Sequence, residues 1–188
     1  MKIFLRYKKI CWLLLGTTFN SWLILGMCYG ENILSNSSFE IWHDTLGLSA
    51  PNGWVTSELY NSSTAVRTTH AHTGTYAIQL GVPSQDGAVG GVGRFVNIVG
   101  GSNYTLNLYY DCPEGVKGYV AIAQFDESDS VLHIVSSYLG PSAGYSLFDT
   151  TFTAHENAAK FWVGCNISAE GDGMWGIYYD DIGLYRIP

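Results

Sequence analysis

Period-two alternation of apolar and polar side chains is the feature that most constrains the fold of this chain. Alternating runs occur at residues 76–80, 104–110, 148–152, 161–167 and 178–184, and glycine-rich turns separate them. Successive side chains of a strand point to opposite faces, so such runs predict half-buried β-strands. After residue 30, no segment keeps a helical apolar period over three turns. We therefore expect one all-β domain, an antiparallel β-sandwich.

The first thirty residues differ from the rest. Four basic residues precede an apolar stretch over residues 10–29. This order predicts a secretory signal peptide over residues 1–30, cleaved near the Gly30–Glu31 bond, with the folded domain at 31–188. The alternative is an uncleaved N-terminal membrane anchor. Either way, we expect a secreted or cell-surface protein.

Charge narrows the class of ligand. Five basic and 16 acidic residues follow residue 30, which gives that part a formal charge of −11 against −7 for the whole chain. An acidic surface repels phosphate backbones, which excludes nucleic-acid binding by charge neutralisation. The chain is 14% aromatic and only 13% charged, unlike a disordered protein. Neutral ligands are the expected partners.

A series of short motifs occurs in a specific order. It runs NILSNSSFE at 32–40, PNGW at 51–54, HTGTYAIQL at 72–80, VNI at 96–98, YTL at 104–106, FDTTFTA at 148–154, FWV at 161–163 and YYDDIGL at 178–184. The series resembles the CenC-like carbohydrate-binding modules of families 4, 9 and 22, which share the galactose-binding-domain-like jelly roll. The resemblance covers essentially the whole chain after the leader. It implies a non-catalytic domain that binds a neutral polysaccharide or oligosaccharide.

The resemblance also implies a structural calcium ion. In the resembled family, the positions of Glu40 and Asp180 bind calcium, together with backbone carbonyls near Ser38 and Thr75. Calcium prefers several oxygen ligands from carboxylates and carbonyls. Alternation places Asp180 on the apolar face of its strand, where an unpaired carboxylate is costly to bury. Asp181, on the opposite face, is the second choice. Alternatively, the two carboxylates are exposed or accept hydrogen bonds from turn amides.

A sugar-facing surface follows from the same alternation. In a jelly roll of this order, the strand beginning at Tyr104 is expected beside the strand beginning at Phe161. The strands that contain Gln79 and Tyr179 belong to the same sheet. The outward set is Gln79, Thr105, Asn107, Tyr109, Trp162, Asn166 and Tyr179. Aromatic rings stack on the C–H faces of sugars, and amides bind hydroxyl groups. Trp54 flanks this cleft or plugs the core, and a loop covering Trp162 or Tyr109 is the alternative to an open face.

The two cysteines after the leader are expected in the core. Alternation places both Cys112 and Cys165 inward, on neighbouring strands. An exported pair favours a disulfide, and two buried thiols are the alternative.

Other motifs carry less chemistry. His70 and His72 form an H-x-H pair, but no third ligand has a fixed spacing to them, so we expect a solvated loop. No carboxylate pair is placed by spacing for glycoside hydrolysis, so we expect no enzyme. Such modules usually accompany a glycoside hydrolase, and residues 31–188 leave no room for one, so a separate hydrolase or cell-surface partner is expected. The alternative function is a cell-surface structural or protein-interaction β-sandwich without sugar binding.

Overall fold

The computed structural model describes residues 30–45, 48–56, 64–82, 89–169 and 175–188, so the expected leader lies outside the described residues except for Gly30. The strands in these ranges are β1 (Trp42–Thr45), β2 (Leu48–Pro51), β3 (Val55–Thr56), β4 (Thr64–Thr68), β5 (Ala77–Val82), β6 (Val89–Asn97), β7 (Asn103–Asp111), β8 (Val116–Phe125), β9 (Val131–Leu139), β10 (Ser146–Thr153), β11 (Lys160–Ala169) and β12 (Trp175–Arg186). None of the described residues belongs to a helix long and apolar enough to cross a membrane.

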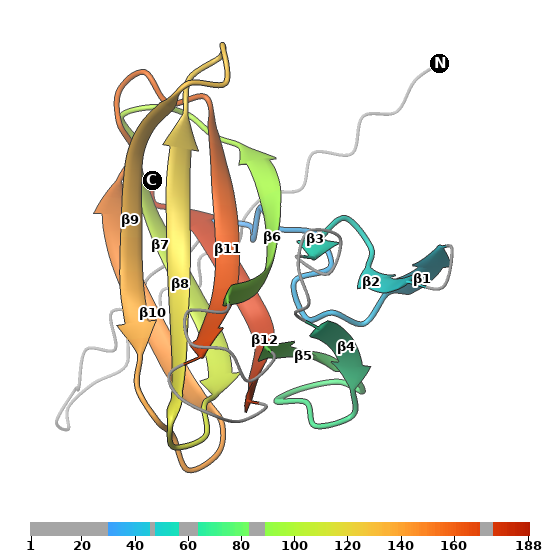
Figure 1. The fold of residues 1–188 in the computed structure, drawn as a ribbon. Coiled ribbons are helices and arrows are strands. Elements are labelled where there is room, and N and C mark those ends of the chain that lie inside the picture. The colour runs from blue at the N-terminus through green and yellow to red at the C-terminus, as the bar shows by residue number, and fades with distance from the viewer. Residues whose placement is uncertain (1–29, 46–47, 57–63, 83–88, 170–174) are drawn as a thin grey trace, which may run out of the picture.

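Two antiparallel five-stranded sheets face one another (Figure 1). The sheet centred on β12 has the order β10-β7-β12-β5-β4 and is called the β12 sheet. The sheet centred on β11 has the order β3-β6-β11-β8-β9 and is called the β11 sheet. Strands β1 and β2 pair only with each other and project to one side of the sandwich. The predicted antiparallel β-sandwich is confirmed.

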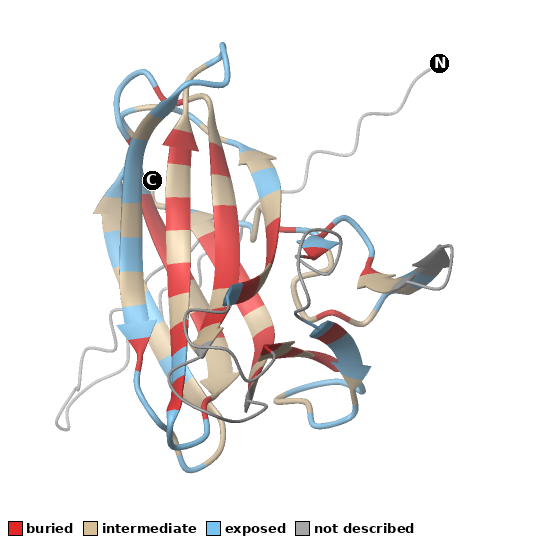
Figure 2. Ribbon diagram, viewed as in Figure 1, coloured by how far each residue is buried: buried red, intermediate tan, exposed pale blue. Residues whose placement is uncertain are grey.

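The hydrophobic core lies between the two sheets. Burial alternates along β8 in Figure 2, as expected for a strand with one face on a core. Ile122 and Val163 come from the β11 sheet, and Leu106 and Leu184 come from the β12 sheet. All four side chains are buried. Edge strand β9 is exposed along most of its length.

The expected pairing of two strands is wrong. Strand β7 pairs with β10 and β12, whereas β11 pairs with β6 and β8, so these strands belong to opposite sheets. Alternation determines which residues share a face of one strand, but it does not determine which sheet the strand joins. The predicted sugar face therefore divides in two. Trp162 and Asn166 lie on the β11 sheet, and the remaining members lie on the β12 sheet.

Tyr179 is also misplaced by simple alternation. It was expected outward, but its side chain is fully buried, as are those of Ile177 and Ile182. The register of β12 against β7 shifts between Asp180 and Gly183, and Asp181 has a positive φ of 46°. A β-bulge adds one residue to a strand and reverses the alternation beyond it. The bulge therefore lets both Tyr179 and Ile182 face the core.

Cys112 and Cys165 are buried free thiols. The expectation that they lie on neighbouring strands is wrong, because Cys112 follows β7 in the β12 sheet and Cys165 lies in β11. Burial raises the pKa of both thiols.

Candidate functional site

Small residues form a trough across the outer face of the β11 sheet. The registers of β6, β11, β8 and β9 align Gly93, Gly164, Ala121 and Ser136 in one cross-strand row. One flanking row contains Gly91, Asn166, Tyr119 and Tyr138, and the other contains Phe95, Trp162, Ala123 and Ile134. Residues two apart on a strand share a face, so these rows form one surface with a low centre and aromatic sides.

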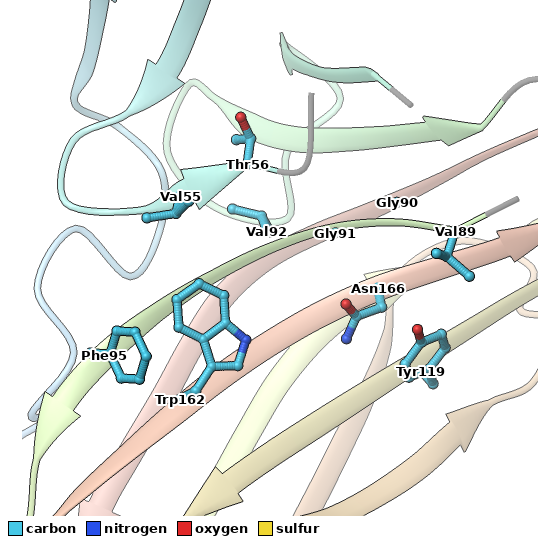
Figure 3. Close-up of a pocket in the computed structure, with 10 residues that line it drawn as sticks. All are labelled: Val55, Thr56, Val89, Gly90, Gly91, Val92, Phe95, Tyr119, Trp162 and Asn166. Carbon is cyan, nitrogen blue, oxygen red and sulfur yellow. The ribbon is translucent and has the colours of Figure 1, made fainter. Parts of the chain in front are cut away.

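A pocket of about 400 Å³ occupies the β6 end of this trough, and we call it the β11 cleft (Figure 3). Its lining residues are Val55, Thr56, Val89, Gly90, Gly91, Val92, Phe95, Tyr119, Trp162 and Asn166. Strand β3 contributes Val55 and Thr56 as one wall, because it pairs with β6 opposite Gly93 and Val92. Among the described lining residues there is no charged side chain.

The Trp162 indole lies against the backbone of β6. A Cβ atom built on Gly93 would lie only 2.5 Å from Cε2 of the indole, so a glycine is required beneath the ring. Phe95 meets the indole edge to face with ring centroids 4.8 Å apart, and this residue is 53% exposed. These contacts hold a half-exposed aromatic platform at the cleft.

Two polar groups of the cleft have no side-chain partner. The structure shows no hydrogen bond for the Trp162 indole N–H or the Asn166 carboxamide among the described residues. Both residues are only half-buried, so these polar groups do not carry the energetic cost of a fully buried group without a hydrogen-bond partner. Tyr119 is half-buried beside Tyr138, and burial raises the pKa of its phenol. The cleft therefore offers donors and acceptors to a ligand.

Sequence reasoning missed Tyr119, Phe95 and the glycines of β6. The signal was present as the run Val89-Gly90-Gly91-Val92-Gly93, in which glycines interrupt a strand and indicate close approach of another group. Alternation in residues 119–123 likewise places small residues beside Tyr119. The partner strand that completes the trough could not be identified without the sheet order.

The outer face of the β12 sheet exposes less free aromatic surface than the β11 cleft. It contains Asn107 and Tyr109, two of the predicted sugar-facing residues, with Gln79 nearby on β5. The Tyr109 ring is stacked on His72 with centroids 3.5 Å apart, so another side chain covers this platform. Tyr145 in turn stacks on His70 at 5.3 Å. These rings pack on each other and leave little free aromatic surface.

The histidine pair lies in the loop between β4 and β5, as expected, but both rings contact carboxylates and His72 is only partly exposed. His70 contacts Asp111 over 2.8 Å, and His72 contacts Asp181 over 2.8 Å. Only His70 is largely exposed. The segment between β4 and β5 folds back on β7 and β12, an arrangement that local sequence does not indicate.

Two further members of the predicted sugar face are excluded by burial. Thr105 is buried, and its hydroxyl pairs with that of Thr151 on β10 at 3.2 Å. Trp54 is also buried, and its indole N–H donates to the carbonyl of Asn36 at 3.1 Å. Its ring packs on Phe39 at 5.0 Å, so Trp54 plugs the core and does not flank a cleft. Tyr179 is excluded for the reason given above.

Glu40 and Asp180 converge on the same turn. Glu40 Oε1 accepts the backbone N–H groups of Thr75 and Tyr76, at 2.8 and 2.9 Å. Asp180 Oδ2 accepts those of His72 and Thr73, at 2.8 and 3.2 Å. The alternative left open by the sequence, hydrogen bonding to turn amides, is therefore observed. Burial raises the pKa of Asp180 to about 6, and the neighbouring charge of Asp181 adds to this effect.

The chemistry of this donor set fits a hard cation. Two carboxylates that are far apart in the sequence bind the same turn, and the carboxylate of Asp180 is fully buried. Oxygen atoms are the ligands that calcium prefers. Within the described residues, however, no group of three or more His, Cys, Asp or Glu side chains is placed to hold a metal ion. Backbone carbonyls, such as those near Ser38 and Thr75, would have to complete the coordination.

No family model matches the sequence, and no curated protein is detectably similar to it. Solved structures are similar in fold. The enzymatically active domain of tailspike protein 4 from bacteriophage CBA120 is 14% identical with a TM-score of 0.62, over 83% of this chain and 21% of that one. The carbohydrate-binding module TmCBM61, solved with β-1,4-galactotriose, is 14% identical with a TM-score of 0.55, over 84% of this chain and 99% of that one.

A third structure contains the CBM22-1 and GH10 modules of Clostridium thermocellum xylanase 10B with xylohexaose. It is 12% identical with a TM-score of 0.59, over 86% of this chain and 29% of that one. The chain thus spans about a fifth of the tailspike chain and under a third of the xylanase chain, but nearly all of TmCBM61. At these identities the likeness establishes the fold. The chain has the β-sandwich jelly-roll fold of the carbohydrate-binding modules.

Proposed function

We propose that the β11 cleft binds a neutral polysaccharide or oligosaccharide without cleaving it. The observation that carries this proposal is the trough itself. Small residues form its floor, the Trp162 and Tyr119 rings flank it, and the amide of Asn166 points into it without a partner. A sugar ring has apolar C–H faces and a rim of hydroxyl groups, so it needs this combination of flat rings and neutral polar groups.

Charge supports a neutral ligand and argues against hydrolysis. No carboxylate lines the cleft among the described residues, so none of these residues can act as the paired acids that glycoside hydrolysis requires. The acidic chain as a whole disfavours anionic ligands. The similar modules solved with β-1,4-galactotriose and xylohexaose also bind neutral oligosaccharides. These two sugars are therefore the first probes.

Affinity electrophoresis and calorimetry across a neutral glycan panel test this proposal. Trp162→Ala removes the platform. One pyranose covers about 100 Å² of an indole face, which at about 25 cal/mol/Å² is worth about 2.5 kcal/mol. We therefore expect the Kd to rise by about 50-fold or more. Circular dichroism should show that the variant is still folded. Tyr109→Ala is the control on the other sheet and should leave binding intact. Loss of binding in Tyr109→Ala alone would place the ligand on the β12 sheet.

A protein-interaction role is the second candidate. Ile134 and Val131 are exposed on edge strand β9, and Tyr138 has 78% of its surface exposed. Exposed apolar side chains on an unpaired edge are typical of contact surfaces. Failure of the protein to bind any glycan, together with self-association or partner capture that Ile134→Lys abolishes, would favour this role.

We further propose export and a role beside other proteins. The basic start and apolar run of residues 1–30 support a signal peptide, and the domain would then act outside the cell or at its surface, alone or beside a glycoside hydrolase. N-terminal sequencing of the exported protein should give Glu31 as the first residue. A retained leader in the membrane fraction would favour the anchor.

We also propose a structural calcium ion held by Glu40 and Asp180, with backbone carbonyls near Ser38 and Thr75. The ion would neutralise the buried Asp180 carboxylate and tie the first and last parts of the domain to one turn. Because a ligand bound only to the folded state stabilises it, excess chelator should lower the melting temperature, and calcium should restore it. Glu40→Gln should remove this response. A melting curve that chelator does not change would exclude the ion.

A further inference from the structure

Two side-chain nitrogens face one another above a glycine in the β11 cleft. A Cβ atom built on Gly164 would lie 3.0 Å from Trp162 Nε1 and 3.4 Å from Asn166 Nδ2. Figure 3 shows the indole nitrogen on the side of the ring that faces Asn166, and the amide of Asn166 directed toward the indole. Neither nitrogen has a hydrogen-bond acceptor among the described residues. Stacking on an aromatic ring does not account for this convergence.

Glycines of β6 make the arrangement possible. A Cβ on Gly93 would overlap the indole, at 2.9 Å from Nε1 and 2.5 Å from Cε2. A Cβ on Gly91 would lie 2.5 Å from Asn166 Oδ1. Separations under 3.0 Å are essentially never seen for real Cβ atoms. Any larger residue at either position would therefore displace Trp162 or Asn166. The glycines allow both side chains to lie along the sheet and turn their nitrogens toward the space above Gly164.

We infer that the space above Gly164 is a two-donor subsite, in which the Trp162 indole N–H and the Asn166 amide N–H together bind one oxygen of the ligand. This inference rests on the proposed function. Both groups are neutral donors, so the matching ligand group is a neutral oxygen with two lone pairs, such as a sugar hydroxyl or an acyl carbonyl. The exposed indole face lies beside the donors, so that oxygen belongs to a sugar whose C–H face covers Trp162.

This geometry assigns roles to four residues. Asn166 and Trp162 would touch the ligand. Gly93 would act as a positioning residue, because it sets the orientation of the indole and therefore the direction of its N–H group. Gly164 would keep the space between the donors empty, since a methyl group there would stand between them.

Three variants of the full chain test the subsite, with β-1,4-galactotriose and xylohexaose as probes. Asn166→Asp replaces a donor by an acceptor of the same shape, Gly164→Ala fills the space, and Gly93→Ala tilts the indole. We expect each to raise the Kd for the bound probe at least tenfold. Gly140→Ala is the matched control, because a Cβ there meets nothing within 4 Å. It should bind as the unaltered protein does.

The ¹H–¹⁵N resonance of the Trp162 indole, assigned by its loss in Trp162→Phe, gives a readout that a merely structural role would not move. It should shift in ligand-free Gly93→Ala and Gly164→Ala but not in Gly140→Ala. It should also move downfield when the unaltered protein binds a probe. If a probe binds without moving it, or Asn166→Asp binds equally well, the subsite is wrong and the proposed function stands. If no glycan of the panel binds, the proposed function and the subsite both fail.

Discussion

Replacing Tyr179 by phenylalanine removes a single hydroxyl group from the middle of the sandwich. Tyr179 is fully buried in the β12 sheet, and its hydroxyl donates to the backbone carbonyl of Asn166 in the β11 sheet over 2.6 Å. A buried hydrogen bond contributes about 0.5–1.5 kcal/mol, and a buried acceptor left without its partner adds to the loss. We expect Tyr179→Phe to lower the free energy of unfolding by about 1.5 kcal/mol.

The expected change is measurable by thermal unfolding. For a domain of this size, 1 kcal/mol corresponds to about 2–4 °C, so the melting temperature should fall by about 3–6 °C. Circular dichroism or calorimetry measures it, and urea unfolding should show a lower midpoint with an unchanged slope. Tyr178→Phe is the control. The Tyr178 ring contacts His70 edge to face, and the structure shows no hydroxyl hydrogen bond for it among the described residues, so we expect a change below about 0.5 kcal/mol.

The comparison tests the β-bulge directly. Without the bulge, alternation would place Tyr178 in the core and Tyr179 outside. A larger loss of stability in Tyr178→Phe than in Tyr179→Phe would therefore refute the bulge and the assignment of faces beyond it. Glycan affinity should change less than threefold in either variant, since neither side chain lines the β11 cleft.

Two further predictions concern packing and thiols. Gly100→Ala should lower the free energy of unfolding by about 2 kcal/mol, because the new Cβ would overlap the carbonyl oxygen of Glu156 and lie 2.9 Å from that of Ala158. If this variant and Gly140→Ala melt at the same temperature, this packing is contradicted. Cys112 and Cys165 should resist alkylation in the folded protein, because they are buried and burial raises their thiol pKa. Both should react after denaturation without a reductant. Peptide mapping that finds them disulfide-linked would contradict the structure.

The sequence was sufficient for local features of the fold. Alternation predicted the strands that contain Leu106, Val163 and Leu184, because a half-buried strand must repeat every two residues. It also predicted that Trp162 and Asn166 share an outward face. These inferences depend only on neighbours along one strand, so no knowledge of other strands is needed.

Alternation failed where contacts between distant segments decide the outcome. Tyr179 points inward because a bulge shifts the register of β12 against β7. Tyr109 is covered because the segment with His72 folds over it. Alternation did not place Trp54, which the sequence left open between cleft and core; the structure places it in the core, where its ring packs on Phe39.

The candidate site shows the same division. The sequence by itself determined that Trp162 and Asn166 point outward from one strand. Their apolar neighbours Phe161, Val163 and Cys165 face the core, and adjacent side chains of a strand point to opposite faces. Only the tertiary structure placed Gly93 and Gly91 of β6 on one side of them and Tyr119 and Ala121 of β8 on the other. Strand order comes from packing the two sheets as a whole, and no local pattern encodes it, so the trough exists only once the sheet is assembled.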